Sequence, residues 1–176
     1  QHAAPPHQPA AASPATPPGA SEAAESSPAP LPAEILESAE RGELQTVVKW
    51  LRKGGSADAF YSTTTTDGRP LATTLLHAAA ANDQLEMVRE LLKRGASIDL
   101  PTSLGDTALM GAAYRGHLSI LLVLLQHSAN PDLQNIYGGT RALMMAADGG
   151  HEACVQALLR AGANTQLLDE DGRTAL

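Results

Sequence analysis

Aliphatic side chains recur at helical spacing in three separate segments of this chain. The segments contain Leu85, Val88, Leu91 and Leu92; Leu118, Leu121, Leu124 and Leu125; and Val155, Leu158 and Leu159. Residues three or four positions apart lie on one face of an α-helix, so each segment predicts an amphipathic helix with one buried face. A shorter segment before each of them carries two adjacent alanines, at 79–80, 112–113 and 146–147. We expect a second helix there, whose small side chains let a neighbouring unit approach closely.

These helix pairs repeat along the chain. Leu76 is 33 positions before Leu109, and Leu109 is 34 positions before Leu143. A fixed period of this length predicts a stack of similar helix–turn–helix units. The first helix of a unit is expected to begin at a threonine, a preferred N-cap residue, and to end at a residue with left-handed backbone. A glycine or serine is expected to mark the end of the second helix. The threonines are Thr74, Thr107 and Thr140, and the helix-ending residues are Asp83, Gly95, Gly116, Ser128, Gly150 and Gly162.

The last complete unit departs from this pattern at its start. One more residue separates Thr140 from Leu143 than separates Thr107 from Leu109. Either the chain bulges near Arg141, or Arg141 replaces the threonine at the helix start. Both alternatives predict a weaker start for this helix.

The N-terminal 30 residues differ in composition from the rest of the chain. They contain no Val, Ile, Leu, Met, Phe, Trp or Tyr, and nine of the twelve prolines lie between Pro5 and Pro32. Such a segment buries too little apolar area to offset the conformational entropy of ordering, roughly 1–2 kcal/mol per residue. We therefore expect residues 1–32 to form a disordered, Pro/Ala-rich linker. Its loose Pro-x-x-Pro spacing leaves open a docking role with a polyproline-reading domain, although the segment has no basic residue.

A more divergent unit lies between this linker and the first regular unit. Residues 38–44 parallel residues 112–118, and Trp50 aligns with the core position Leu91. The distance from Ala39 to Ala80 is 41 positions, which is longer than the period of 33. The excess falls in the Thr-rich stretch 61–74, and we expect the threonines at 63–66 to form a mobile loop.

The repeated segments resemble the ankyrin-repeat family. The family's Thr-Pro-Leu-His segment corresponds to Thr74-Leu-Leu-His77 and Thr107-Ala-Leu-Met110, and its Gly-His-Leu-Glu segment to Gly116-His-Leu-Ser119 and Gly150-His-Glu-Ala153. The resemblance covers about residues 33–176 and implies an all-α fold class: an ankyrin-repeat solenoid of paired antiparallel helices joined by hairpin-like turns. It implies units at about 33–60, 74–101, 107–134 and 140–168, with the start of a further unit at 169–176. Because the pattern is interrupted at residue 176, we expect the sequence to be a fragment.

Composition and charge exclude several classes of protein. One cysteine cannot form an internal disulfide framework or a four-cysteine zinc site. The longest apolar run, residues 120–125, is too short to span a membrane. A net charge of −7 argues against binding of duplex nucleic acid, which needs a positive surface. Because the N-terminal residues do not match a secretory signal, we expect an intracellular, cytoplasmic location.

The residues that could carry chemistry are better explained by structural roles. His117 and His151 occupy the Gly-His position, where the family's histidine links one turn to the next. Cys154 lies in an apolar helical row that predicts a buried, inert thiol. The carboxylates at 169–171 form a short acidic run at a turn tip, without the downstream glutamate that closes a calcium loop. We therefore expect no enzyme activity, no metal and no cofactor in this segment.

The resemblance also implies where a partner binds. Ankyrin arrays bind other proteins through a concave surface and the projecting turn tips. This predicts a non-catalytic interaction scaffold with a protein partner, and we expect a monomer. The candidate protein-binding residues are Ser103, Leu104, Asp106, Tyr114, Arg115, Ile136, Tyr137, Asp148, Glu170 and Asp171.

Five of these residues are expected to form one contact patch across two units. Tyrosine and arginine are frequent at binding hot spots, and the five are Leu104, Tyr114, Arg115, Ile136 and Tyr137. The alternative is that Leu104 and Ile136 pack on neighbouring tips beneath Tyr137. Two other functions also stay open: the targeting or regulatory portion of a larger enzyme whose catalytic domain lies outside this sequence, and a purely structural tether.

Overall fold

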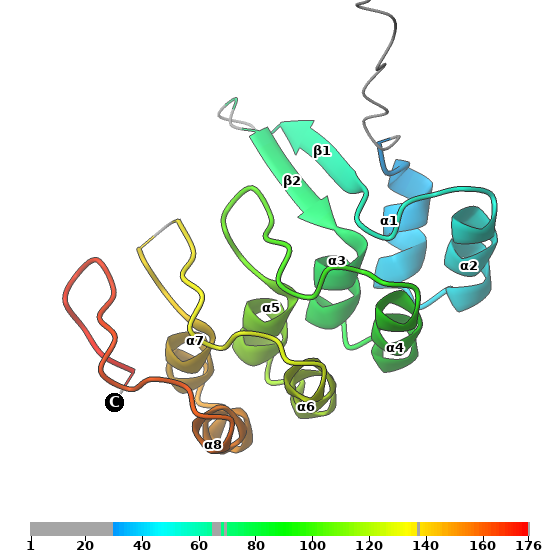
Figure 1. Ribbon diagram of the computed structural model, residues 1–176. Coiled ribbons are helices and arrows are strands. Elements are labelled where there is room, and N and C mark those ends of the chain that lie inside the picture. Colours follow the sequence, from blue (N-terminus) through cyan, green and yellow to red (C-terminus); the bar gives the residue numbers. More distant parts are fainter. Residues whose placement is uncertain (1–29, 65–67, 69, 137, 176) are drawn as a thin grey trace, which may run out of the picture.

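The computed structural model describes residues 30–64, 68, 70–136 and 138–175. Over these residues the chain forms four pairs of helices that stack side by side (Figure 1). The helices are α1 (Ala33–Glu40), α2 (Leu44–Arg52), α3 (Leu75–Ala81), α4 (Leu85–Lys93), α5 (Ala108–Arg115), α6 (Leu118–Gln126), α7 (Ala142–Asp148) and α8 (Glu152–Arg160). The first helix of each pair lies in an inner layer, and its antiparallel partner lies in an outer layer. This arrangement confirms the predicted solenoid of paired helices.

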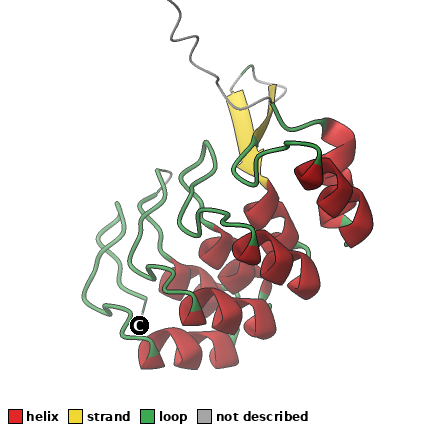
Figure 2. Cartoon of the chain, turned by 45° about the vertical axis from the view of Figure 1, so that its right-hand side comes forward, coloured by secondary structure: helices red, strands yellow, loops and turns green. Residues whose placement is uncertain are grey.

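The segments that connect successive pairs leave the inner layer in a common direction. Each forms a turn that projects beyond the helices, and the turns lie in a row (Figure 2). We call these turns the tips: the first is the segment between α2 and α3, followed by tips around residues 102–106, 135–140 and 169–173. The tips and the inner helices together border one face of the array.

Small side chains make the contacts between inner helices. The alanine pairs at 79–80 and 112–113 are completely buried, and α5 packs between α3 and α7. Helix axes can lie close together only where the side chains between them are small. In α7, Ala146 is buried but Ala147 is partly exposed, because no further inner helix covers α7 within the described residues.

The outer helices bury or partly bury the predicted aliphatic side chains except Leu159, which is 38% exposed. The fully buried side chains include Val88, Leu91, Leu121, Leu124 and Leu158. α6 is aliphatic over most of its length, so it also presents Leu122 to solvent with 41% of its surface exposed. Cys154 in α8 is 1% exposed, which confirms the prediction of a buried thiol.

The helix ends follow the sequence signals. Thr74 Oγ1 accepts a hydrogen bond from the backbone N–H of His77 (3.1 Å), and Thr107 Oγ1 accepts one from Met110 (3.3 Å). Both bonds confirm threonine as the N-cap. Asp83 follows α3 with a φ of +58°, a left-handed conformation that costs an ordinary residue roughly 1–2 kcal/mol. Ser128 and the four glycines predicted at helix ends also have positive φ.

The start of α7 differs from the other two regular units. The N-cap residue is Arg141, with extended backbone and no side-chain hydrogen bond to the helix. Of the two alternatives left open by the sequence, Arg141 therefore replaces the threonine. The N–H of Thr140 instead donates to Oδ1 of Asn135 (2.9 Å), which closes the tip in front of the helix.

The Thr-rich stretch differs from the mobile loop that the sequence predicted within the array. It forms an antiparallel hairpin of β1 (Phe60–Thr64) and β2 (Pro70–Thr74), with Phe60 opposite Thr74. Threonine and aromatic residues favour extended backbone, and Tyr61 packs against the core. Thr63 and Thr64 therefore lie in a strand and not in the mobile loop predicted at 63–66, whose other two threonines lie outside the described residues.

The described fold begins before residue 33. Leu31 is 3% exposed, and its N–H donates to the carbonyl oxygen of Phe60 (2.9 Å). The bond ties the entry of α1 to the hairpin, so Leu31 and Pro32 belong with the array and not with the linker predicted at 1–32. The rest of that predicted linker, up to residue 29, lies outside the described residues.

Candidate functional site

Three open cavities lie along the face bordered by the tips and the inner helices. Their volumes are about 520, 300 and 200 Å³. The largest lies at α7 and the last tip, the second lies between α3 and α7 beside α5, and the smallest lies between α1, α3 and the hairpin. We call this surface the concave groove. The lining residues used in the argument are Glu40, His77, Leu104, Asp106, Met110, Tyr114, Arg115, Met145, Asp148, Asp169 and Arg173.

Tyr114 occupies the central position in the groove. It lies near the end of α5, lines both the 520 Å³ and the 300 Å³ cavities, and is 56% exposed. The guanidinium carbon of Arg115 lies 6.0 Å from the centre of the Tyr114 ring. At an exposed site such a cation–π contact is worth about 0.5–1 kcal/mol, enough to bias both side chains toward one arrangement.

His77 supplies a neutral polar group to the smaller cavities. Its Nδ1 lies 3.2 Å from Oγ1 of Thr73. Burial lowers the pKa of His77 below its ordinary 6.5, an effect that the nearby carboxylate of Asp106 opposes. The imidazole is therefore neutral at pH 7. Gly111 lies opposite, where a Cβ would approach Nε2 of His77 to 3.3 Å.

Backbone hydrogen bonds join each tip to the one before it. Ser103 N–H donates to the carbonyl of Ala72 (2.9 Å), and Ile136 N–H donates to that of Leu104 (3.1 Å). The N–H of Glu170 continues the row by donating to the carbonyl of Gly138 (2.9 Å). The predicted tip residues are thus held in register from the hairpin to the last unit.

Two further sets of polar side chains, one of histidines and one of aspartates, fix the spacing of successive units. His151 Nε2 lies 3.0 Å from the carbonyl oxygen of Tyr114, and His117 Nε2 lies 3.3 Å from that of Ala81. These contacts confirm the structural role predicted for both histidines. At the base of the tips, aspartate Oδ1 atoms accept from backbone N–H groups one unit further on. The pairs are Asp58 with Ser97 (2.7 Å), Asp99 with Asn130 (3.1 Å) and Asp132 with Asn164 (2.8 Å).

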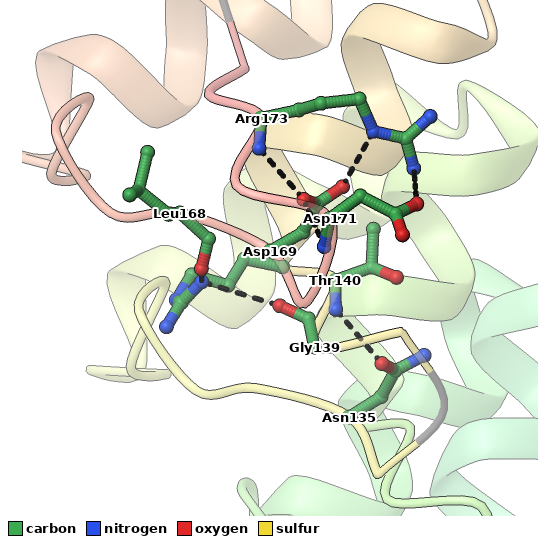
Figure 3. A network of polar contacts seen from close by, with 8 residues as sticks. Asn135, Gly139, Thr140, Leu168, Asp169, Asp171 and Arg173 are labelled. Carbon is green, nitrogen blue, oxygen red and sulfur yellow. Dashed lines mark hydrogen bonds and ion pairs between the residues drawn. The ribbon is translucent and has the colours of Figure 1, made fainter.

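The last tip is closed by its own charges. Asp169 accepts hydrogen bonds from the backbone N–H of Arg173 (2.8 Å) and from its Nε (2.9 Å), while Arg173 also pairs with Asp171 (2.9 Å; Figure 3). The backbone N–H of Arg173, followed by its side chain, lowers the pKa of Asp169. Arg141 reaches the same region, where Nη1 donates to the carbonyl oxygens of Gly139 (3.2 Å) and Leu168 (2.8 Å).

The structure brings together half of the ten predicted binding residues. Leu104, Asp106, Tyr114, Arg115 and Asp148 line the concave groove. Ser103, Ile136, Glu170 and Asp171 lie on the tips outside the cavities, and Tyr137 lies outside the described residues.

The two apolar tip residues differ in exposure. Leu104 is partly buried, whereas Ile136 is 63% exposed. Ile136 lies against the preceding tip, where a Cβ at Gly105 would approach its Cγ2 to 3.1 Å, and presents the rest of its surface to solvent. Whether the predicted five-residue patch forms stays a prediction, since one of its members, Tyr137, is not described.

The sequence interpretation missed His77, Met145 and Arg173 as groove residues. Met145 aligns with the small residues Ala78 and Gly111 at equivalent places in the other inner helices. A large side chain at this otherwise small position was a usable signal. Arg173 falls at a variable tip position beside the predicted Glu170 and Asp171, which was a second signal, although its place in the groove depends on the fold of the last tip.

The described residues hold no group of three or more His, Cys, Asp or Glu side chains that could bind a metal ion. Nor does any helix in the described part of the chain have both the length and the apolar character needed to cross a bilayer. What the groove offers is an open surface with an apolar floor and polar walls, which suits recognition of another molecule.

Comparison with known proteins identifies the repeat. A family model described as "Ankyrin repeats (3 copies)" matches residues 35–135, and one described as "Ankyrin repeats (many copies)" matches residues 112–159. The chain belongs to the ankyrin-repeat family. Ankyrin repeats are non-catalytic modules that generally mediate protein–protein interactions, so a protein partner is the expected ligand of this array.

Several curated proteins share this ankyrin array. The chain is 38% identical over 84 residues to the probable E3 ubiquitin-protein ligase XBOS33 of Oryza sativa subsp. japonica, covering 48% of this chain and 16% of that protein. It is 31% identical over 98 residues to the inactive serine/threonine-protein kinase TEX14 of Mus musculus, covering 56% and 7%. It is 36% identical over 107 residues to the nuclear factor NF-kappa-B p105 subunit of Gallus gallus, covering 58% and 11%. The chain thus spans less than a fifth of each of these relatives.

Proposed function

We propose that this ankyrin array is a non-catalytic interaction module that binds a protein partner through the concave groove and the tips beside it. The observation that carries the proposal is the position of Tyr114. The chain has only three tyrosines, and this one is 56% exposed between the two larger cavities. A tyrosine buries a large area at a small cost in conformational entropy, so it suits the centre of an interface.

The surroundings of Tyr114 support the proposal. Its carbonyl oxygen is held by His151, and its ring lies beside the Arg115 guanidinium. The row of tip hydrogen bonds fixes Leu104 and Ile136 relative to the groove. Because these groups are positioned before a partner arrives, little further ordering opposes binding. Ser103, Asp106, Asp148, Glu170 and Asp171 then provide polar groups around this centre.

The proposal is tested by affinity purification of the full-length protein, wild type against Tyr114→Ala. The matched control is Leu122→Ala, which removes an exposed side chain from the outer face of α6. We expect Tyr114→Ala to reduce partner recovery at least tenfold and Leu122→Ala to leave it unchanged, with both variants unfolding within a few degrees of wild type. Full recovery of every partner with Tyr114→Ala contradicts the proposal.

A second candidate is that the array is the targeting or regulatory portion of a larger enzyme. Its support is that the relatives include proteins named as E3 ubiquitin-protein ligases, of which the matched segment is a small part. The complete coding sequence decides between the two, since only the second requires a catalytic domain on the same chain. We further propose that the module is monomeric and intracellular, which sedimentation analysis and imaging of the tagged protein test.

A further inference from the structure

Charge is divided unevenly between the two helix layers. The inner helices α1, α3, α5 and α7 carry four carboxylates, Glu34, Glu37, Glu40 and Asp148, against one cation, Arg115. The outer helices α2, α4, α6 and α8 carry three carboxylates, Glu86, Glu90 and Glu152, against five cations, Lys49, Arg52, Arg89, Lys93 and Arg160. The inner layer is therefore acidic and the outer layer basic. Of the inner carboxylates, Glu40 and Asp148 line the groove, whereas Glu37 pairs with Arg41 (3.5 Å).

The carboxylates extend along the whole groove. Glu40 lines the 200 Å³ cavity, Asp106 borders both the 200 and the 300 Å³ cavities, and Asp148 lines the 520 Å³ cavity. The carboxylate of Asp106 accepts a hydrogen bond from the side-chain amide of Asn135 (3.1 Å), a neutral donor that leaves its negative charge in place.

Among the described residues, the two arginines that line the groove each make a contact within it. Arg173 pairs with both Asp169 and Asp171, at 2.9 Å in each case. Arg115 lies over the ring of Tyr114. Arg115 keeps its positive charge in this contact. The lining carboxylates Glu40, Asp106, Asp148 and Asp169 nevertheless outnumber these two cations, so the potential that an approaching partner meets is negative.

The floor of the middle cavity is apolar and adaptable. Ala81, Met110, Gly111 and Met145 line it, with the Tyr114 ring at one side. Methionine is flexible and polarisable, so it adjusts to side chains of different shape. A volume of about 300 Å³ accommodates a large aliphatic or aromatic side chain.

We propose that the partner segment bound in the concave groove is basic, with Lys or Arg residues on both sides of one large apolar residue. This inference rests on the proposed function and names the chemistry of its partner. The apolar residue occupies the middle cavity against Met145 and Tyr114. The flanking cations face Glu40 and Asp106 on one side and Asp148 on the other. Such complementarity raises the association rate and rejects acidic segments, and it weakens as salt screens the charges.

The test begins with selection of random 12-residue peptides displayed on phage against the full chain. Each selected peptide is synthesised, and its dissociation constant is measured by fluorescence anisotropy against wild type and Tyr114→Ala. We expect the selected peptides to carry net positive charge and one large apolar residue, and to bind Tyr114→Ala at least tenfold more weakly. A selection that yields no peptide, or peptides without net positive charge, overturns the inference.

Two double variants that remove the same number of charges then show which carboxylates attract the basic peptides. Asp106→Asn with Asp148→Asn removes two carboxylates from the groove, and Glu86→Gln with Glu152→Gln removes two from the outer helices. We expect the groove pair to weaken the basic peptides about tenfold in low salt and the outer pair to change the constant less than twofold. Equal weakening by both pairs, or none by the groove pair, overturns the inference.

The two proposals fail in different ways. Peptides that are neutral or acidic but still depend on Tyr114 overturn the basic partner and leave the groove as the binding surface. Peptides that bind Tyr114→Ala as tightly as wild type contradict both proposals, because they locate binding outside the groove.

Discussion

Nε2 of His151 lies 3.0 Å from the carbonyl oxygen of Tyr114, one unit earlier in the chain. His117 and the side-chain amide of Gln84 make the equivalent contact with the units before them, at 3.3 and 3.0 Å. Each unit is therefore tied to its predecessor at the end of an inner helix. At Tyr114 this tie also holds the backbone of the residue that we place at the centre of the binding surface.

Replacing His151 by Ala removes this tie. We expect the free energy of unfolding to fall by about 1 kcal/mol, the usual contribution of one hydrogen bond. His151→Gln should retain most of the stability, because Gln84 makes the same contact with an amide. Urea denaturation of the two variants gives the comparison. If the Gln variant is as unstable as the Ala variant, the contact does not stabilise the stack.

Gly116 should tolerate no side chain, because two effects coincide there. Its φ is +74°, and a Cβ at this position would lie 2.5 Å from Nδ1 of His151. Gly150 has a similar φ of +70° but no atom within 4 Å of its Cβ position. We expect Gly150→Ala to cost about 1–2 kcal/mol for the left-handed backbone alone, and Gly116→Ala to cost more. Equal thermal stability of the two variants would show that the histidine ring moves aside freely.

Arg141 should connect the last tip to the array together with the backbone bond from Glu170 to Gly138. Its guanidinium donates to the carbonyl oxygens of Asp132 (3.2 Å), Gly139 (3.2 Å) and Leu168 (2.8 Å). Hydrogen bonds from a charged group are worth about 1.5–3 kcal/mol. We expect Arg141→Ala to speed amide hydrogen exchange in residues 168–173 at least tenfold while α3 and α5 stay protected.

Arg141→Lys is the matched control for this prediction. Lysine keeps the charge but lacks the planar fork that reaches several carbonyl groups at once. We therefore expect the Lys variant to exchange nearly as fast as the Ala variant. Wild-type protection in the Lys variant would indicate that charge alone suffices.

Stability should depend on pH through His77. Burial lowers the pKa of this histidine in the folded chain below 6.5, so the unfolded chain binds more protons at pH values under 6.5. The stability that the fold gains from a neutral His77 is fully present above pH 6.5. It is lost as the pH falls through the pKa of His77 in the folded chain. We expect the wild type to be less stable at pH 5 than at pH 7.5. His77→Asn should reduce this difference, and an unchanged pH dependence in the variant would contradict the assignment.

Local signals in the sequence were sufficient for most of the helical framework. Thr74 and Thr107 cap helices because the bond from a threonine hydroxyl to an N–H three residues later needs no distant partner. Asp83 and Ser128 follow helices with left-handed backbone, a conformation that is also set locally. The histidine contacts could be expected only through the family resemblance, since their acceptors lie more than 30 residues away in the chain.

Features that depend on contacts between distant segments could not be predicted from local sequence signals. The hairpin forms because Phe60 and Tyr61 find partners in Thr73 and Thr74 and Tyr61 reaches the core, whereas the intervening threonines suggested only a loop. The role of Arg141 likewise depends on carbonyl groups from three separate segments. Met145 becomes part of a cavity only when the units on both sides curve around it.

The most direct test of the account is site-specific photo-crosslinking in cells. The full-length protein carries a photoreactive benzoylphenylalanine at position 114 in the groove or, as the control, at position 122 on the outer face of α6. We expect position 114 to form a crosslink to a protein partner on irradiation and position 122 to form none. A partner crosslinked from position 122 but not from position 114 would contradict this expectation.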